Sequence, residues 1–221
     1  MSIRSICIIV FLVIFDFSVS NAQHFIGFTG GYSVGTFFNY TKEQDYNAIY
    51  HFKSGIAFSS FYETKMDSVC NVRVELQYKW QLADMKIDYK IGHSSFHDNM
   101  EYSFHLLNLN LTIPFRLVEK NKFKLNFLFG FNSSYNINSI AKDLKSLQII
   151  HNSKDLSKFN FGMEIGLDFI IPINNKIDFL FQNRYNIFFT NIITQKNLKY
   201  TSLFTGYLNI GFRYKLKQRQ T

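Results

Sequence analysis

The sequence is poor in cysteine and proline, with two of each among its 221 residues. Cys7 lies inside an apolar N-terminal run, so a chain cut after that run keeps Cys70 alone and forms no internal disulfide. His51, His105 and His151 are isolated and form no pair with metal-ligand spacing, and no glycine-rich phosphate-binding motif is present. The sequence therefore predicts no catalytic residue, no metal ligand and no cofactor. After Phe17 no apolar run reaches the roughly 20 residues of a membrane helix, so a membrane could be crossed only by strands.

The first residues have the pattern of a secretory signal peptide. Arg4 supplies a positive start, and Ile6 to Phe15 form an apolar run of about ten residues, the expected length of such a region. Ser20-Asn21-Ala22 offers small residues where signal peptidase reads, so we expect the cut after Ala22. Asp16 and the polar stretch beyond it argue against the alternative, an uncleaved anchor. We predict a signal peptide over 1–22 and one domain over 23–221.

The formal net charge of +8 comes from basic residues spread along the whole chain. No cluster of five or more basic residues exists, and an exported chain does not meet nucleic acid. The charge therefore favours attraction to anionic lipid headgroups or the solubility of loops.

Aromatic residues are abundant, with 26 Phe and 13 Tyr, and they suit the pleated surface of a sheet. The strongest pattern is alternation of apolar and polar residues with period two, which is typical of strands. In 71–80, for example, Val72 and Val74 share one face while Arg73 and Glu75 share the other. Eight segments follow this rule: 26–35, 52–61, 71–80, 107–116, 122–135, 158–171, 176–189 and 200–214.

The connections between these segments alternate in length. Residues 36–50, 81–100, 136–157 and 191–199 form long connections, whereas 63–68, 119–121 and 172–175 form short ones. Outer-membrane barrels have an even number of strands, short periplasmic turns and long extracellular loops. The sequence therefore predicts an all-β fold, an eight-stranded antiparallel up-and-down transmembrane β-barrel in the cell outer membrane. A soluble secreted sandwich, which also alternates, is the alternative.

The two faces of the segments differ in kind. The apolar face is dense in Phe, Tyr, Ile and Leu, which suits lipid, and the opposite face suits a narrow interior filled by side chains. The charged residues expected inside are Arg73, Glu75, Lys79, Arg116, Lys124, Glu164, Asp168, Asp178, Arg184 and Arg213. Because a lone buried charge is costly, we expect a network of ion pairs. A plug that holds the barrel is favoured over a proton or ion path.

Three aromatic residues and one proline occupy informative positions. Tyr78 and Trp80 would stand at the outer end of their strand and Tyr214 at the periplasmic end of the last strand, as in the aromatic girdles of membrane barrels. Pro114 cannot donate to a strand ladder, so we expect it near the periplasmic end or at a bulge.

Three stretches resemble the PorT-like outer-membrane β-barrel family of Bacteroidetes. Val72 to Tyr78 is similar to the family's "ELxY" strand, and Leu107 to Phe115 resembles its "YLxIPLL" strand, including the proline. Phe127 to Phe131, followed by a Tyr, is loosely similar to its "GPY" strand. The resemblance implies an integral outer-membrane protein, and one group of the family is an accessory to a protein secretion system. The chain departs from the usual ending by adding 215–221 after the last strand.

Three functions remain open from the sequence. The first is a non-catalytic barrel that binds envelope or secretion-system proteins through extracellular loops, such as 136–157 with Leu144, Leu147, Ile149 and Ile150. The second is a narrow porin or transporter. The third, least favoured, is a lipid-modifying enzyme built on His93-Ser94-Ser95 and His97-Asp98, which fall in a long loop and lack rigid support. Outer-membrane lipid is the expected partner in all three, and nucleic acid in none.

Overall fold

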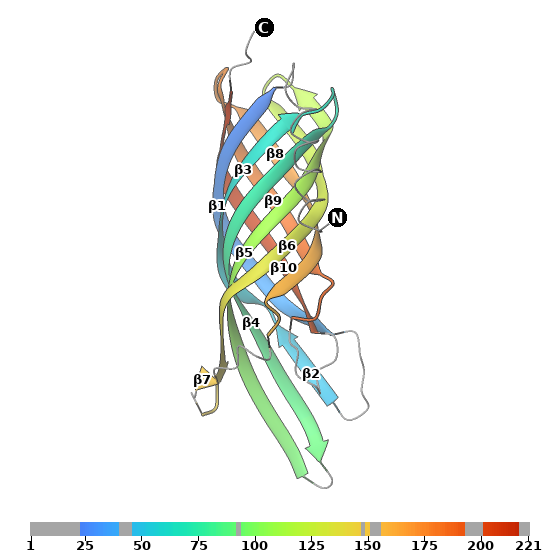
Figure 1. Cartoon of the computed structure of the whole chain (residues 1–221), viewed down its shortest axis with the longest axis vertical. Coiled ribbons are helices and arrows are strands. Elements are labelled where there is room, and N and C mark those ends of the chain that lie inside the picture. Colours follow the sequence, from blue (N-terminus) through green and yellow to red (C-terminus); the bar gives the residue numbers. More distant parts are fainter. Residues whose placement is uncertain are drawn as a thin grey trace, which may run out of the picture.

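The computed structural model describes residues 23–39, 46–91, 94–146, 149–150, 156–192 and 201–216. Eight long strands form one closed antiparallel barrel (Figure 1). They are β1 (His24–Asn39), β3 (Lys53–Lys65), β4 (Asn71–Ile91), β5 (Ser94–Lys120), β6 (Phe123–Asp143), β8 (Phe159–Pro172), β9 (Ile177–Phe188) and β10 (Thr201–Lys215). Two short strands, β2 (Tyr46–His51) and β7 (Ile149–Ile150), lie outside the ring. The predicted signal peptide over 1–22 lies outside the described residues.

Each barrel strand pairs with its neighbour in sequence, and β1 pairs with β10 to close the ring. The predicted eight-stranded up-and-down barrel is therefore confirmed. Among the described residues, no helix has the length and apolar character needed to cross a membrane.

The strand registers fix the tilt of the barrel. Starting at Phe25 and following paired residues once around the ring leads back to β1 at Gly35. The intermediate positions are Glu63, Arg73, Thr112, Gly130, Glu164, Asn186 and Thr205. A stagger of ten residues at about 3.3 Å each, around eight strands about 4.8 Å apart, corresponds to a tilt of about 40°. A barrel of this size has an interior that side chains fill.

The two ends of the barrel are built differently. The connections 66–70, 121–122 and 173–176 are short and lie at one end, together with His24 and Lys215; we call this the short-turn end. The carboxylate of Asp67 accepts hydrogen bonds from the backbone N–H groups of Val69 and Cys70, both at 2.6 Å. These bonds stabilise the ionised form, so they lower the pKa of Asp67 below its ordinary value. Asn174 closes its turn in the same way, which shows why turn-forming residues end these strands.

The opposite end, which we call the long-loop end, carries structure beyond the barrel (Figure 1). The connection 81–100, predicted to be a long loop, is almost entirely strand, since β4 runs to Ile91 and β5 starts at Ser94. β2, which forms within the predicted loop 36–50, pairs with the outer part of β4. β6 continues to Asp143 and pairs there with β7.

The ladders on both sides of β5 are irregular near Pro114. Pro114 pairs with Leu128 of β6, and the ladder between β4 and β5 ends before it, at Arg73 and Thr112. A separate bridge between Cys70 and Phe115 follows. The register between β5 and β6 then shifts by one residue past Arg116. Pro114 thus lies near the short-turn end and close to a bulge, as predicted from its missing N–H donor.

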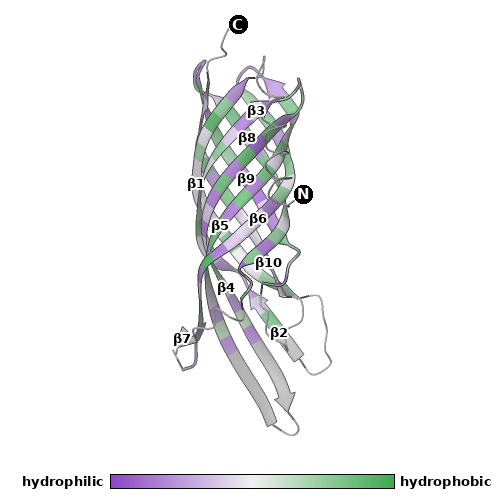
Figure 2. Ribbon diagram, in the orientation of Figure 1, coloured by the Kyte–Doolittle hydropathy of each residue, from purple (hydrophilic) through white to green (hydrophobic). Residues whose placement is uncertain are grey.

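Burial alternates along the barrel strands where they carry the outward apolar residues, and the alternation is inverted relative to a soluble protein. Phe28 and Phe131 are 67% and 62% exposed, whereas Arg73 and Arg184 are completely buried. Figure 2 shows apolar and polar residues alternating along the barrel strands. The apolar residues therefore face outward and the ionic ones face inward, which contradicts the soluble sandwich alternative.

Candidate functional site

The outer surface is an apolar band of bilayer thickness. On β8 the outward positions are all apolar: Phe159, Phe161, Met163, Ile165, Leu167, Phe169 and Ile171. From Phe159 to Ile171 the strand advances twelve residues, or about 40 Å, and a tilt of about 40° reduces the axial span to about 30 Å. A bilayer's hydrocarbon core is about 30 Å thick. The outward face thus matches acyl chains in both chemistry and height.

Aromatic residues mark both edges of this band. The Tyr78 hydroxyl hydrogen-bonds with Nδ1 of His105 at 2.7 Å, and the indole N–H of Trp80 donates to Ser103 at 2.9 Å. At the short-turn end Tyr214 is exposed next to the end of β10, as predicted. These residues form the expected girdles, with their rings against lipid, and the polar atoms of Tyr78 and Trp80 are hydrogen-bonded.

Inside the barrel, three arginines each bridge two carboxylates. Arg184 pairs with Glu75 at 2.7 Å and with Glu164 at 2.8 Å. Arg73 pairs with Asp168 at 2.6 Å and with Glu63 at 2.5 Å.

Arg213 extends this chain of charges by pairing with Glu63 at 2.9 Å and with Asp178 at 2.7 Å. The guanidinium of Arg184 also lies 3.8 Å from Asp168, so the charges form one connected network through five strands: β3, β4, β8, β9 and β10. We call it the luminal ion network, and it confirms the ion pairs predicted from the sequence.

Sequence reasoning misplaced three charged residues relative to the lumen. Glu63 was assigned to a turn but is fully buried and bridges two arginines, because β3 continues to Lys65. Arg116 and Lys124 were expected inside. Both instead lie at the short-turn end, partly exposed, and pair with Glu119. A residue on the inward face of a strand points to the rim, and not into the lumen, when it lies at the end of that strand. The alternation alone does not show this difference.

Lys79 and neutral polar side chains fill the rest of the lumen. The ammonium of Lys79 donates to Thr205 Oγ1 at 3.0 Å and lies 4.7 Å from the ring centroid of Tyr207. β5 and β6 contribute amides and hydroxyls in place of charges. Asn108 donates to Gln77 at 2.9 Å, and Asn132 donates to Asn110. The interior is thus occupied by side chains all around its wall.

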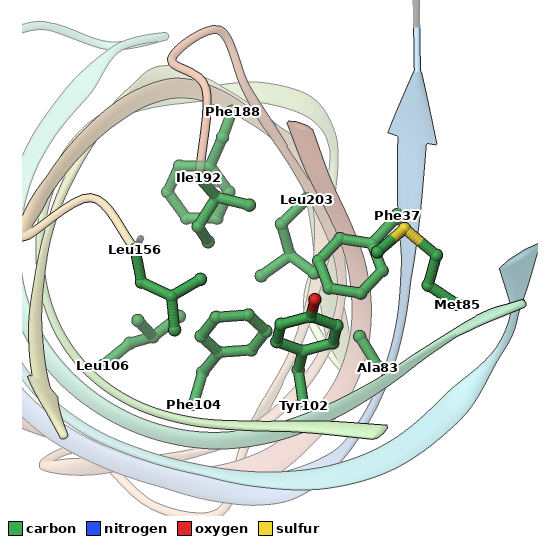
Figure 3. Packing of buried hydrophobic residues seen from close by; sticks show 10 residues of the cluster. All are labelled: Phe37, Ala83, Met85, Tyr102, Phe104, Leu106, Leu156, Phe188, Ile192 and Leu203. Carbon is green, nitrogen blue, oxygen red and sulfur yellow. The ribbon is translucent and has the colours of Figure 1, made fainter. Parts of the chain in front are cut away.

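Between the luminal ion network and the long-loop end, the lumen is closed by a buried apolar cluster. We call it the mouth cluster; it consists of Phe37, Ala83, Met85, Tyr102, Phe104, Leu106, Leu156, Phe188, Ile192 and Leu203. Figure 3 shows these ten side chains gathered inside the ring of strands. Ala83 and Met85 follow Lys79 on β4, and Phe188 follows Arg184 on β9, so the cluster lies between the ions and the long-loop end.

Two members of the mouth cluster come from connections and not from barrel strands. Ile192 follows β9, and Leu156 precedes β8. Their segments are joined by backbone hydrogen bonds, from Ser157 N–H to Ile192 C=O at 3.0 Å and from Ile192 N–H to Thr201 C=O at 2.8 Å. The loops therefore form a strap that holds apolar side chains in the mouth. Leu156 belongs to the predicted long connection 136–157, but it is not one of the four apolar residues that the sequence analysis named there.

The residues considered for catalysis are not assembled into a described site. His93 lies outside the described residues. Ser94, Ser95, His97 and Asp98 lie at the start of β5, in the part of the hairpin furthest from the barrel. In the ladder His97 lies opposite Asp88 of β4, whereas Asp98 lies opposite Ile87. Among the described residues, no group of three or more His, Cys, Asp or Glu side chains could hold a metal ion.

Comparison with known proteins gives one family and several structures of the same general shape. The family model described as "Outer membrane protein beta-barrel domain" matches residues 21–194, most of the chain. No curated protein matches the sequence.

Three solved structures illustrate the likeness. Neisserial surface protein A is 10% identical, with a TM-score of 0.48 and coverage of 89% of this chain and 100% of the other. OprG of Pseudomonas aeruginosa is 15% identical, with a TM-score of 0.47 and coverage of 90% and 98%. Ail, the attachment invasion locus protein of Yersinia pestis, is 12% identical, with a TM-score of 0.42 and coverage of 86% and 99%.

The family match covers seven of the eight barrel strands, from β1 to β9, which carry most of the outward apolar face and of the luminal ion network. The chain belongs to the outer membrane protein beta-barrel domain family and is a small β-barrel protein of the outer membrane.

Proposed function

We propose that this barrel is a non-catalytic binding or assembly element of the cell envelope, which presents its long-loop end to a protein partner. The observation that carries the proposal is the combination of a filled lumen with an ordered hairpin outside it. The luminal ion network and the mouth cluster lie in series along the barrel axis, so a solute would have to displace both. The structure beyond the membrane is therefore the part available for function.

The β4–β5 hairpin is the main element of this outer part. The ladder between β3 and β4 ends at Gly55 and Gln81, but β4 and β5 stay paired as far as Ile91 and Ser94. Ten further residues of strand at about 3.3 Å each make a projection of about 30 Å. β2 lies along its edge, so three strands form a platform there.

The base of the platform is fixed to the barrel on both faces. On the inner face Met85 and Tyr102 belong to the mouth cluster, and Tyr50 of β2 packs against it. On the outer face Lys53 pairs with Asp84 at 3.2 Å and with Glu101 at 3.3 Å, which joins β3, β4 and β5. A hairpin held at its base is a suitable support for a recognition surface, because its geometry is fixed before a partner binds.

The resemblance to the PorT-like family suggests one kind of partner. If the resemblance extends to function, the platform would serve a protein secretion complex. The same platform would also suit other envelope proteins, and the lumen gives no reason to expect solute transport.

A hairpin truncation tests the proposal most sharply. Residues 87–98 are replaced by Asn-Gly, a two-residue turn that closes a β-hairpin, which leaves the mouth cluster intact. The control places Asn-Gly at 121–122, at the other end of the barrel. We expect both variants to fold, and we expect the hairpin variant alone to lose the partner recovered by cross-linking intact envelopes. Equal recovery with both variants, or steady conductance of the unmodified barrel in a planar bilayer, would contradict the proposal.

The non-catalytic part of the proposal has its own measurement. Mass spectrometry of lipid A compares cells that carry the unmodified protein, the His93→Ala variant or no protein. We expect the three spectra to be identical. A modification that disappears with His93→Ala would replace this proposal with a lipid-modifying activity.

A further inference from the structure

The net positive charge of the described residues is concentrated at one end of the barrel. Among the described residues the short-turn end carries seven basic residues, Lys65, Arg116, Lys120, Lys122, Lys124, Lys176 and Lys215, and two acidic ones, Asp67 and Glu119. The lumen carries four basic and five acidic residues, so it is close to neutral. The long-loop end carries six basic and five acidic residues. The basic excess of the described chain therefore lies at the short-turn end.

These basic side chains are directed at the surroundings and are little used within the fold. Lys120, Lys122 and Lys176 are exposed, and none of them takes part in an ion pair among the described residues. Glu119 is shared by Arg116 and Lys124, so one carboxylate serves two cations. The surplus charge has no counterion of its own in the described part of the chain.

The height of these residues relative to the apolar band identifies what they face. Lys215 follows Tyr214, a residue of the aromatic girdle, and Lys176 precedes Ile177, where the apolar face of β9 begins. Lys65 lies three residues beyond Tyr62, which hydrogen-bonds with Nδ1 of His24 at 2.7 Å. A ring of cations just outside an interfacial aromatic belt lies at the depth of lipid headgroups.

We propose that the short-turn end is a binding surface for anionic phospholipid headgroups of the periplasmic leaflet. Short turns of outer-membrane barrels face the periplasm, so this ring meets the inner leaflet. Anionic headgroups supply the negative charge that the ring lacks, and each lysine near such a surface strengthens binding about fivefold. Bound anionic lipid would hold the barrel at a fixed depth while the opposite end engages its partner.

A competition between two lipids tests this proposal on the intact barrel. The folded protein in zwitterionic detergent receives equal amounts of phosphatidylglycerol and phosphatidylethanolamine, and native mass spectrometry counts the molecules of each lipid retained. We expect phosphatidylglycerol to be preferred. The triple variant Lys120→Gln, Lys122→Gln, Lys176→Gln should lower that preference about tenfold, a fraction of the full effect expected for three lysines.

A charge-matched control separates position from total charge. Lys86, Lys145 and Lys158 are exposed residues of the long-loop end, so the triple variant Lys86→Gln, Lys145→Gln, Lys158→Gln removes the same net charge. We expect it to keep the preference within about twofold, and we expect Lys→Arg changes at 120, 122 and 176 to retain it because the charge remains. Salt at about 0.5 M, where the Debye length is about 4 Å, should weaken the preference.

The possible failures are equally definite. Equal retention of both lipids by the unmodified barrel would overturn the proposal. So would equal losses in the two glutamine variants, because total charge and not position would then be responsible. Displacement of the lipid by excess glycerol phosphate would assign the ring to a soluble phosphate and would also overturn it. Partner cross-linking at the hairpin is a separate readout, so failure here would leave the proposed function untouched.

Discussion

Replacing Arg184 with methionine should destabilise the barrel more than any comparable change of a basic residue outside the lumen. The guanidinium of Arg184 pairs with both Glu75 and Glu164, and all three side chains are completely buried. Methionine fills much of the same volume but leaves two carboxylates without their partner. Two buried negative charges would then face each other in a medium of low polarity.

The size of the effect follows from the burial of these groups. Breaking a buried ion pair by removing one partner costs about 3–5 kcal/mol, because an uncompensated buried charge remains. That cost is a large fraction of the roughly 5–15 kcal/mol that stabilises a typical folded domain. With a denaturant slope of about 2 kcal/mol per molar urea, the unfolding midpoint should fall by about 2 M.

Reversible urea unfolding in lipid vesicles, followed by tryptophan fluorescence of Trp80, measures the change. The control is Arg116→Met, whose partner Glu119 is partly exposed, and its expected cost is about 0–1 kcal/mol. The combination of Arg184→Met with Glu75→Gln and Glu164→Gln removes the stranded charges and should recover most of the loss. Equal midpoints for Arg184→Met and Arg116→Met would refute the luminal ion network as a source of stability.

Three further predictions concern the wall, the outer face and the mouth of the barrel. Gly31→Ala should cost about 2 kcal/mol or more, because the added Cβ would overlap the carbonyl oxygen of Leu208. The Cβ of Gly206→Ala would come closest to the movable ring of Tyr185, so this variant should cost about 1 kcal/mol or less, and equal midpoints in urea would contradict the difference. Phe131→Lys, at the middle of the outward band, should cost about 2–4 kcal/mol relative to Phe131→Leu, whereas Met66→Lys at the short-turn end should cost about 0–1 kcal/mol. A similar cost at both positions would argue against a lipid-facing band. Ile192→Ala should cost about 2–4 kcal/mol, because it leaves a cavity in the mouth cluster. Planar-bilayer recording of this variant should still show no steady conductance, because the luminal ion network remains. An open channel would show that the mouth cluster alone closes the barrel.

The sequence was sufficient for the barrel itself because alternation has a direct physical cause. Successive side chains on a strand point to opposite faces, so a lipid on one side and a polar lumen on the other impose period two. The faces of Val72 to Trp80 and of Phe159 to Phe169 are as predicted. The luminal glycines Gly27, Gly31, Gly35, Gly162 and Gly166 also occupy inward positions, as expected.

The sequence was not sufficient where an apolar residue could meet either lipid or protein. Phe104 and Leu106 are as apolar as Leu107 and Leu109, but they face inward into the mouth cluster. This extension of the apolar pattern to both faces hid the true length of β5, which begins at Ser94. Phe61 interrupts the alternation of β3 in the same way. Because it is an apolar residue at an inward position, the sequence pattern does not show that the strand continues to Glu63.

The short strands outside the ring were missed for a different reason. β2 consists of six residues and β7 of two, so each is too short to establish a period. Both exist because they pair with strands that project beyond the barrel. Such pairing depends on a neighbour far away in sequence, which local patterns do not contain.

A cysteine scan along β8 tests the orientation of the two faces most directly. Single cysteines at positions 161 to 165, in a Cys70→Ser background, carry a nitroxide label in the barrel reconstituted into a bilayer, and paramagnetic resonance measures collisions with oxygen and with a water-soluble nickel complex. Labels at Phe161, Met163 and Ile165 should collide with oxygen, and labels at Gly162 and Glu164 should be shielded from both reagents. Oxygen access at 162 and 164, or equal access at all five positions, would contradict a barrel with its apolar side chains in lipid and its ions inside.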